Sequence, residues 1–114
     1  MLFERRRANR DRRQGGRVAA VFAVRNTVGS HLQLGQAEDV GPSGMTLRRP
    51  RNLPVQPETP LSLTFDLPGV GRIDAAGLVV SDRRYGPFRR TGVRFIRIDP
   101  AHAALLSDFC TRRS

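Results

Sequence analysis

The sequence predicts a mainly β fold: a six-stranded antiparallel β-barrel followed by one C-terminal α-helix. Its 114 residues fit one domain with one core. Six short segments of alternating or apolar residues are separated by turns rich in glycine and proline, a spacing typical of small barrels. A helical period appears only after Asp99-Pro100, where an N-cap residue precedes a proline at the first helical position.

The strands are predicted from their periodicity and from the turns between them. The clearest is 61–67, where apolar residues alternate strictly with polar ones, as in a strand with one buried face. The four prolines of 50–60 predict an extended surface connection, because proline donates no hydrogen bond to a sheet. The predicted strands are 17–25, 31–39, 45–49, 61–67, 72–82 and 88–98. Turns are expected at 26–30, 39–44, 68–71 and 84–87.

Three of these elements have patterns that predict more than their presence. The first strand has apolar residues on both faces, which predicts that it is covered on both sides for part of its length. In the sixth strand the alternation slips after Phe95, which predicts a bulge or a change of partner. The apolar face of the helix over 101–112 is expected to hold Leu105 and Phe109, with Leu106 and Cys110 beside them.

Charge is concentrated at the N-terminus. The formal net charge is +10, and half of it lies in residues 1–17, where seven arginines stand against two carboxylates. The chain contains no lysine, so every cation is a planar guanidinium that can bind phosphate through two hydrogen bonds. We expect residues 1–16 to form a flexible basic arm that can bind an anion, and residues 17–114 to form the barrel domain.

Signals for catalysis or metal binding are poor. His31 and His102 lie far apart and have no cysteine or histidine at metal-ligand spacing. No nucleophile elbow, phosphate-binding loop with lysine or paired-carboxylate motif is present, so we expect neither an enzyme nor a cofactor. Cys110 is the only cysteine, which excludes an internal disulfide. No apolar run reaches the length of a signal peptide or membrane span, so we expect a cytoplasmic protein that does not insert into a membrane.

Two short motifs favour a compact ligand that carries several phosphates. Arg12, Arg13 and Arg17 stand directly before the first strand, and guanidinium planes can stack on purines while their donors reach phosphate or a guanine edge. The turn at 39–44 supplies Asp39, whose carboxylate can accept hydrogen bonds from a guanine. Two glycines in that turn let the backbone approach a ligand closely.

In this order the two motifs resemble those of PilZ domains, which are bacterial receptors for cyclic di-GMP. The family has an Arg-Arg-x-x-x-Arg run before its first strand and Asp/Asn-x-Ser-x-x-Gly between its second and third strands. The similarity extends through 64–68, 92–95 and 99–101, and it covers residues 5 to 110. It implies a six-stranded barrel that binds one or two cyclic di-GMP molecules.

The resemblance also implies roles for individual residues. Arg12, Arg13 and Arg17 correspond to the arginines that contact phosphate and guanine. Asp39 and Gly44 correspond to the turn that cradles a guanine. A second register over Arg5-Arg6-Arg7-Ala8-Asn9-Arg10 also fits the arginine spacing, but only the later register ends directly at the strand.

One position departs from the family pattern. Gly41 stands where the motif has serine, and Ser43 can substitute for it only if the turn shifts. A missing neutral hydrogen bond costs about 0.5–1.5 kcal/mol, which corresponds to a roughly three- to tenfold loss of affinity. The sequence therefore supports two functions: a cyclic di-GMP receptor that signals to a protein effector, or an adaptor of the same fold that binds proteins and no nucleotide. Nucleic-acid binding is less favoured, because tryptophan is absent and Tyr85 is the only tyrosine.

Overall fold

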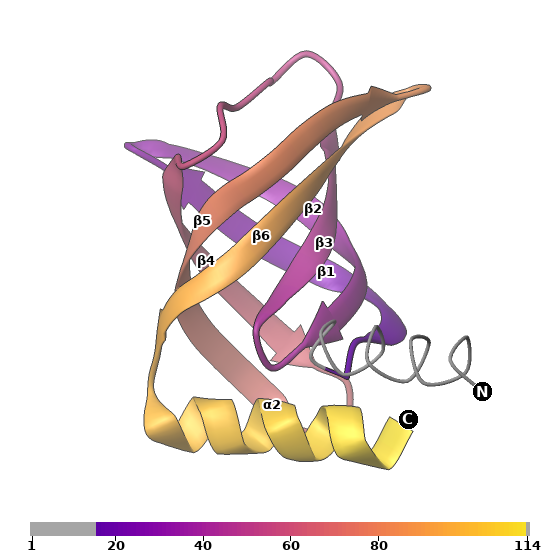
Figure 1. The fold of residues 1–114 in the computed structure, drawn as a ribbon, viewed down its shortest axis with the longest axis vertical. Coiled ribbons are helices and arrows are strands. Elements are labelled where there is room, and N and C mark those ends of the chain that lie inside the picture. Colours follow the sequence, from indigo (N-terminus) through magenta and orange to yellow (C-terminus); the bar gives the residue numbers. More distant parts are fainter. Residues whose placement is uncertain (1–15, 114) are drawn as a thin grey trace, which may run out of the picture.

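A computed structural model describes residues 16–113 of the chain. Six antiparallel strands form a closed barrel in the order β1-β2-β3-β6-β5-β4, and a helix follows them (Figure 1). The strands are β1 (Val18–Val28), β2 (His31–Gly41), β3 (Gly44–Pro50), β4 (Pro60–Leu67), β5 (Gly71–Tyr85) and β6 (Phe88–Ile98). The helix is α2 (Pro100–Arg113). The predicted fold class is confirmed.

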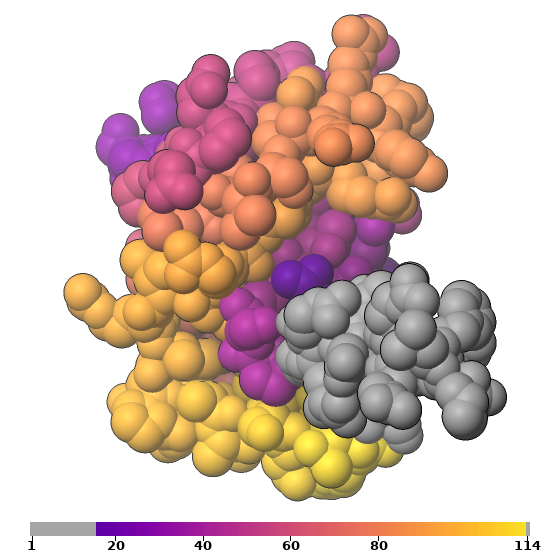
Figure 2. Space-filling view, in the orientation of Figure 1, coloured from indigo at the N-terminus to yellow at the C-terminus, as the bar shows by residue number. Residues whose placement is uncertain are grey.

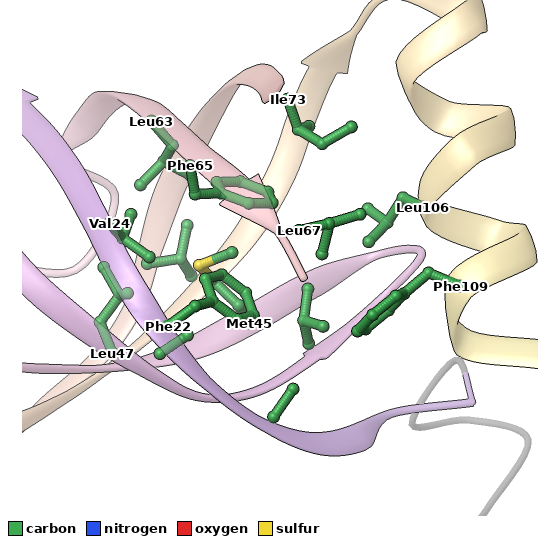
Figure 3. Close-up of a cluster of buried hydrophobic side chains, with 14 of the residues drawn as sticks. Phe22, Val24, Met45, Leu47, Leu63, Phe65, Leu67, Ile73, Leu106 and Phe109 are labelled. Atoms are coloured by element: carbon green, nitrogen blue, oxygen red, sulfur yellow. The ribbon is translucent and has the colours of Figure 1, made fainter. Parts of the chain in front are cut away.

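The barrel interior is filled by the inward-facing side chains of the strands. In β4 burial alternates along the strand as predicted, with Leu61, Leu63, Phe65 and Leu67 buried. Phe65 stacks on Phe22 of β1, with ring centroids 5.4 Å apart. Figure 3 shows these rings and the leucines of β4 converging in one cluster that continues to the helix.

Helix α2 closes one end of the barrel. It begins as predicted, because Asp99 Oδ1 accepts a hydrogen bond from Ala101 N at 2.8 Å. Its buried residues are Leu106, Phe109 and Cys110, and burial raises the pKa of the Cys110 thiol. The prediction for Leu105 was wrong, since 41% of this residue is exposed. The inward stripe of the helix is narrower than its apolar sequence pattern.

The predictions made for the sixth and first strands had different outcomes. The bulge predicted in the sixth strand is confirmed: Ala76 pairs with Arg97 and Gly77 with Phe95, so Ile96 has no partner in β5. The prediction that β1 is covered on both sides was wrong. Its burial alternates strictly from Val18 to Val24, and Val21 is 68% exposed. Because the exposed residues on its outer face are alanine and valine, the sequence of this half-buried strand resembles that of a strand buried on both sides.

The strands run further than their turn signals predicted. The turn expected at 26–30 is reduced to Gly29 and Ser30. The turns expected at 39–44 and 84–87 each contain only two residues between strands, 42–43 and 86–87. Turn-forming residues at the ends of strands can pair in a ladder, so composition overestimated the length of each turn.

The end of the barrel opposite α2 is polar. Asp82 accepts hydrogen bonds from Thr91 Oγ1 (2.7 Å), Arg89 Nε (2.7 Å) and the backbone N–H of Val55 (3.2 Å). Arg49 lies 3.7 Å away, and the side chains of Arg49 and Asp82 are only 1% and 2% exposed. Burial raises the pKa of Asp82, but the bonds from Thr91, Arg89 and Val55 outweigh it, so this pKa is lower than usual.

Candidate functional site

The two sequence motifs meet at one ion pair. Arg17 Nη1 donates to Asp39 Oδ1 at 3.2 Å and to Thr46 Oγ1 at 3.1 Å. The same carboxylate oxygen accepts from the backbone N–H of Thr46 at 3.2 Å. The sequence analysis placed Asp39 in the turn at 39–44. In the structure it lies in β2, directly opposite Thr46 of β3. The ladder holds Asp39 in place, and Asp39 in turn orients Arg17.

This pair keeps hydrogen-bonding capacity for a ligand. The Arg17 and Asp39 side chains are 30% and 34% exposed. Neither Nε nor Nη2 of Arg17 has a hydrogen-bond partner among residues 16–113, and Asp39 Oδ2 has none there either. One donor edge and one acceptor atom are thus available side by side, the combination that a phosphate next to a guanine requires.

A groove of about 420 Å³ begins at Arg17 and crosses the outer face of β3, β6 and β5. Its floor is formed where Thr46, Gly92 and Ser81 stand side by side on the three strands. A Cβ at Gly92 would lie 2.8 Å from Ser81 Oγ, so only glycine leaves this floor flat. In Figure 2 the surface is hollowed where the magenta hairpin meets the orange strands.

The far wall of the groove is basic and aromatic. Arg90 lies over the ring of Tyr85, 4.0 Å from its centroid, and its Nε is 3.0 Å from Glu38 Oε1. The hydrogen bond to Glu38 raises the pKa of Arg90. Arg83 lines the same wall and has no ion-pair or hydrogen-bond partner among the described residues. A flat base can therefore contact an aromatic face and guanidinium planes along this wall.

The turn glycines have a structural role. A Cβ at Gly44 would lie 2.1 Å from the carbonyl oxygen of Val93 and 3.1 Å from Arg17 Nη2. Gly44 therefore lets β3 approach β6 closely, whereas the sequence assigned it to close approach by a ligand. Gly41 is buried at the end of β2 and pairs with Gly44. Ser43 is exposed, and its carbonyl accepts a hydrogen bond from Phe95 N at 2.8 Å.

The remaining predicted site residues, Arg12 and Arg13, lie outside the described residues. The sequence analysis missed Thr46 and the far wall of the groove. Thr46 could have been found, because a two-residue turn after Gly41 places it opposite Asp39. The wall could not, because it depends on which strand lies beside β3, and a closed barrel order cannot be read from periodicity.

The described part of the chain contains neither a metal-binding cluster nor a membrane-spanning helix. No group of three or more His, Cys, Asp and Glu side chains between residues 16 and 113 could hold a metal ion. Within the same range, α2 is too short and too polar to cross a bilayer.

Comparison with known proteins identifies relatives of this fold. The family model described as PilZ domain matches residues 4–112. No curated protein sequence matches the chain significantly. Among solved structures, the inhibitor of motility MotI/DgrA of Bacillus subtilis matches with a TM-score of 0.79 and 19% identity, over 85% of this chain and 48% of that chain. The chain thus spans about half the length of that relative.

Two further structures contain a bound nucleotide. The PilZ domain of YcgR from Escherichia coli, solved with c-di-GMP, matches with a TM-score of 0.69 and 13% identity, over 85% of this chain and 87% of that domain. PlzA of Borreliella burgdorferi, in complex with c-di-GMP, matches with a TM-score of 0.59 and 9% identity, over 98% of this chain and 57% of PlzA. At these identities the likeness establishes the fold.

Proposed function

The chain belongs to the PilZ domain family, and on that premise we propose that it is a receptor for cyclic di-GMP without catalytic activity of its own. The observation that carries the proposal is the contact between Arg17 and Asp39. It joins the last arginine of the N-terminal run to the first residue of the second motif, at the mouth of a groove with an unobstructed glycine floor.

Each group in the groove has a chemical role in this proposal. The unpaired Nε and Nη2 of Arg17 donate to a phosphate, and Asp39 Oδ2 accepts from the N–H groups of a guanine. The base lies over Gly92, with Tyr85 at its edge. Arg12 and Arg13 close on the ligand from the N-terminal side and supply the charge that a doubly anionic ring requires.

Ligand binding then presents a changed surface to a protein effector, and we propose that this occurs in the bacterial cytoplasm. The supporting observation is the place of Arg17, which lines the groove directly after the arm, so an arm that closes on the ligand would change the surface around it. Such a receptor transmits a signal by binding.

Titration calorimetry of the whole chain with cyclic di-GMP tests the proposal. We expect saturable heat at tens of micromolar ligand in low salt, and its stoichiometry gives the number of bound ligands. Arg13→Ala should abolish binding, while the matched variant Arg5→Ala should change it little. No heat for the wild type would refute the receptor function, and the reverse order of the two variants would assign the motif to the earlier register.

A second candidate is supported by Gly41, which lacks the hydroxyl that the family motif has at this position. In that case the chain is a PilZ-fold adaptor that binds proteins without nucleotide. Gly41→Ser separates the two functions: for a receptor we expect a gain in affinity of about three- to tenfold, the value of one neutral hydrogen bond. For an adaptor, wild type and an Arg13→Ala/Arg17→Ala double variant should complement a deletion equally well.

A further inference from the structure

The β5–β6 hairpin brings arginines face to face on three neighbouring strands. The sequence Arg83-Arg84-Tyr85-Gly86-Pro87-Phe88-Arg89-Arg90 folds back on itself, so that Arg83 pairs with Arg90 and Arg84 with Arg89. β3 extends both pairings through its own arginines. We call the first set of three the groove row, Arg48, Arg90 and Arg83. We call the second set the rim row, Arg49, Arg89 and Arg84.

Among the described residues, one carboxylate contacts each row of three guanidinium groups. Glu38 contacts Arg48 at 3.1 Å and Arg90 at 3.0 Å, and Asp82 contacts Arg89 and Arg49 of the rim row. Arg83 and Arg84 are exposed and have no ion-pair partner among residues 16–113. The β5 strand of the hairpin therefore carries positive charge that no described carboxylate balances. Like charges directly opposite one another also destabilise a sheet, so an anionic partner would relieve this repulsion.

Within residues 16–113, the backbone of β5 also lacks a partner along one side of this hairpin. β4 pairs with β5 only as far as Leu78. The connection before β4 adds backbone–backbone hydrogen bonds at Val79, and beyond Val79 its Val55 N–H bonds the side chain of Asp82 and leaves the backbone of Asp82 free. The two-residue loop makes Tyr85 and Phe88 a hydrogen-bonded pair, so the N–H and C=O groups of Asp82 and Arg84 point away from β6. Figure 1 shows this hairpin extending beyond the barrel, at the end opposite α2.

We propose that the free edge of β5, residues 80–85, binds an extended acidic segment of a protein partner by strand addition. The unpaired backbone groups supply the main-chain hydrogen bonds, and Arg83 and Arg84 supply complementary charge on the two faces of the added strand. Only a polypeptide can satisfy both features, because a nucleic acid or an anionic membrane offers charge without backbone amides. The inference goes beyond the proposed function, since it adds a protein ligand on the edge of β5. Val80, Ser81, Arg83 and Tyr85 of this segment also line the ligand groove, whereas Arg84 does not, so Arg84 is the residue that separates the two sites.

The probe is a capped, fluorescent ten-residue peptide in which pairs of glutamates alternate with pairs of threonines. Its glutamates therefore lie on both faces when it is extended. Binding to the whole chain is followed by fluorescence anisotropy. The same peptide with glutamine in place of glutamate tests charge, and one N-methylated at alternate backbone nitrogens tests strand addition. We expect each change to weaken binding about tenfold, the value of a charge-assisted hydrogen bond or of several backbone bonds.

Arg84→Glu is the protein variant, and Arg97→Glu is its matched control. Arg97 lies on β6 at the end far from the hairpin loop, opposite Ala76. It is exposed and has no described side-chain partner, and both variants change the net charge by the same amount. We expect Arg84→Glu to weaken peptide binding at least about tenfold and Arg97→Glu to change it less than about twofold. Cyclic di-GMP titrations of Arg84→Glu should match the wild type, which keeps this test separate from the receptor function.

Several results would overturn the proposal. The first is no binding of the acidic peptide to the wild type. The second is an equal loss in Arg84→Glu and Arg97→Glu, which would mean that net charge alone attracts the peptide. The third is unchanged affinity after N-methylation. The fourth is equal affinity for a ten-nucleotide single-stranded DNA or for phosphatidylserine vesicles, which would make the hairpin a general polyanion site.

Discussion

The two ends of the barrel are closed by opposite means. At one end, Leu106 and Phe109 of α2 pack on Leu67 and the rest of the apolar core (Figure 3). At the other, the buried carboxylate of Asp82 accepts hydrogen bonds from two residues of β6 and from the connection between β3 and β4. The apolar end is held by burial, which is not directional. The polar end is held by bonds that require particular atoms in particular places.

The two ends therefore contribute different properties to the protein. A buried ion pair such as Arg49–Asp82 contributes little net stability, because desolvation offsets most of the attraction. It does fix geometry. Asp82 is flanked by Ser81 and Arg83, whose side chains line the groove on the opposite face of β5. The polar end therefore positions the arginines, while the apolar end supplies most of the stability.

The largest expected effect is at the polar end. Asp82→Ala leaves the guanidinium of Arg49 buried without its counter-charge, which should lower the free energy of unfolding by about 3–5 kcal/mol. Urea denaturation measures this loss. Cyclic di-GMP affinity, measured where the variant is still folded, should fall as well, because Arg83 loses its support. A stable variant with wild-type affinity would show that the network does not position the groove.

A similar or smaller loss of stability is expected at the apolar end. Leu106 is fully buried, so Leu106→Ala should lower the free energy of unfolding by about 2–5 kcal/mol through lost burial and a cavity. Ligand affinity of the folded variant should stay within about twofold of the wild type, because the groove lies on other elements. If affinity fell as steeply as stability, the two ends would not be separable.

The buried carboxylate at the polar end should make stability sensitive to acid. The pKa of Asp82 is lowered in the folded state, whereas an unfolded aspartate titrates near 3.9. Its contribution to stability is thus complete above about pH 4 and is lost as the pH falls through the folded pKa. Urea denaturation between about pH 5 and pH 2 should show a shallower loss of stability in Asp82→Asn than in the wild type.

The smallest expected effect lies at the groove mouth, between the two ends. Thr46→Val removes the hydroxyl that accepts from Arg17 and retains the shape of the side chain. The free energy of unfolding should change by less than about 1.5 kcal/mol, and cyclic di-GMP affinity should fall about three- to tenfold. Thr64→Val, which removes a similar bond to Asp74, is the control and should leave affinity unchanged.

Much of the fold could be predicted from the sequence. Six strands, the helix with its Asp99 cap and the bulge in β6 all follow from local periodicity, because side-chain alternation and helix capping are decided by near neighbours. The errors were also local in origin. Residues such as Ala19, Ala23 and Leu105 are apolar but do not decide which side of an element is buried, so their pattern overstated the extent of the core.

The sequence by itself determined the barrel, its motifs and the identity of Arg17 and Asp39 as candidate partners. Only the tertiary structure decided that Thr46 completes their contact, that Gly92 forms the groove floor, and that the arginines of three strands stand in rows. These features depend on strand order and register, which join residues that lie tens of positions apart. A local pattern indicates which face of a strand is buried, but closure of the barrel decides which strands become neighbours.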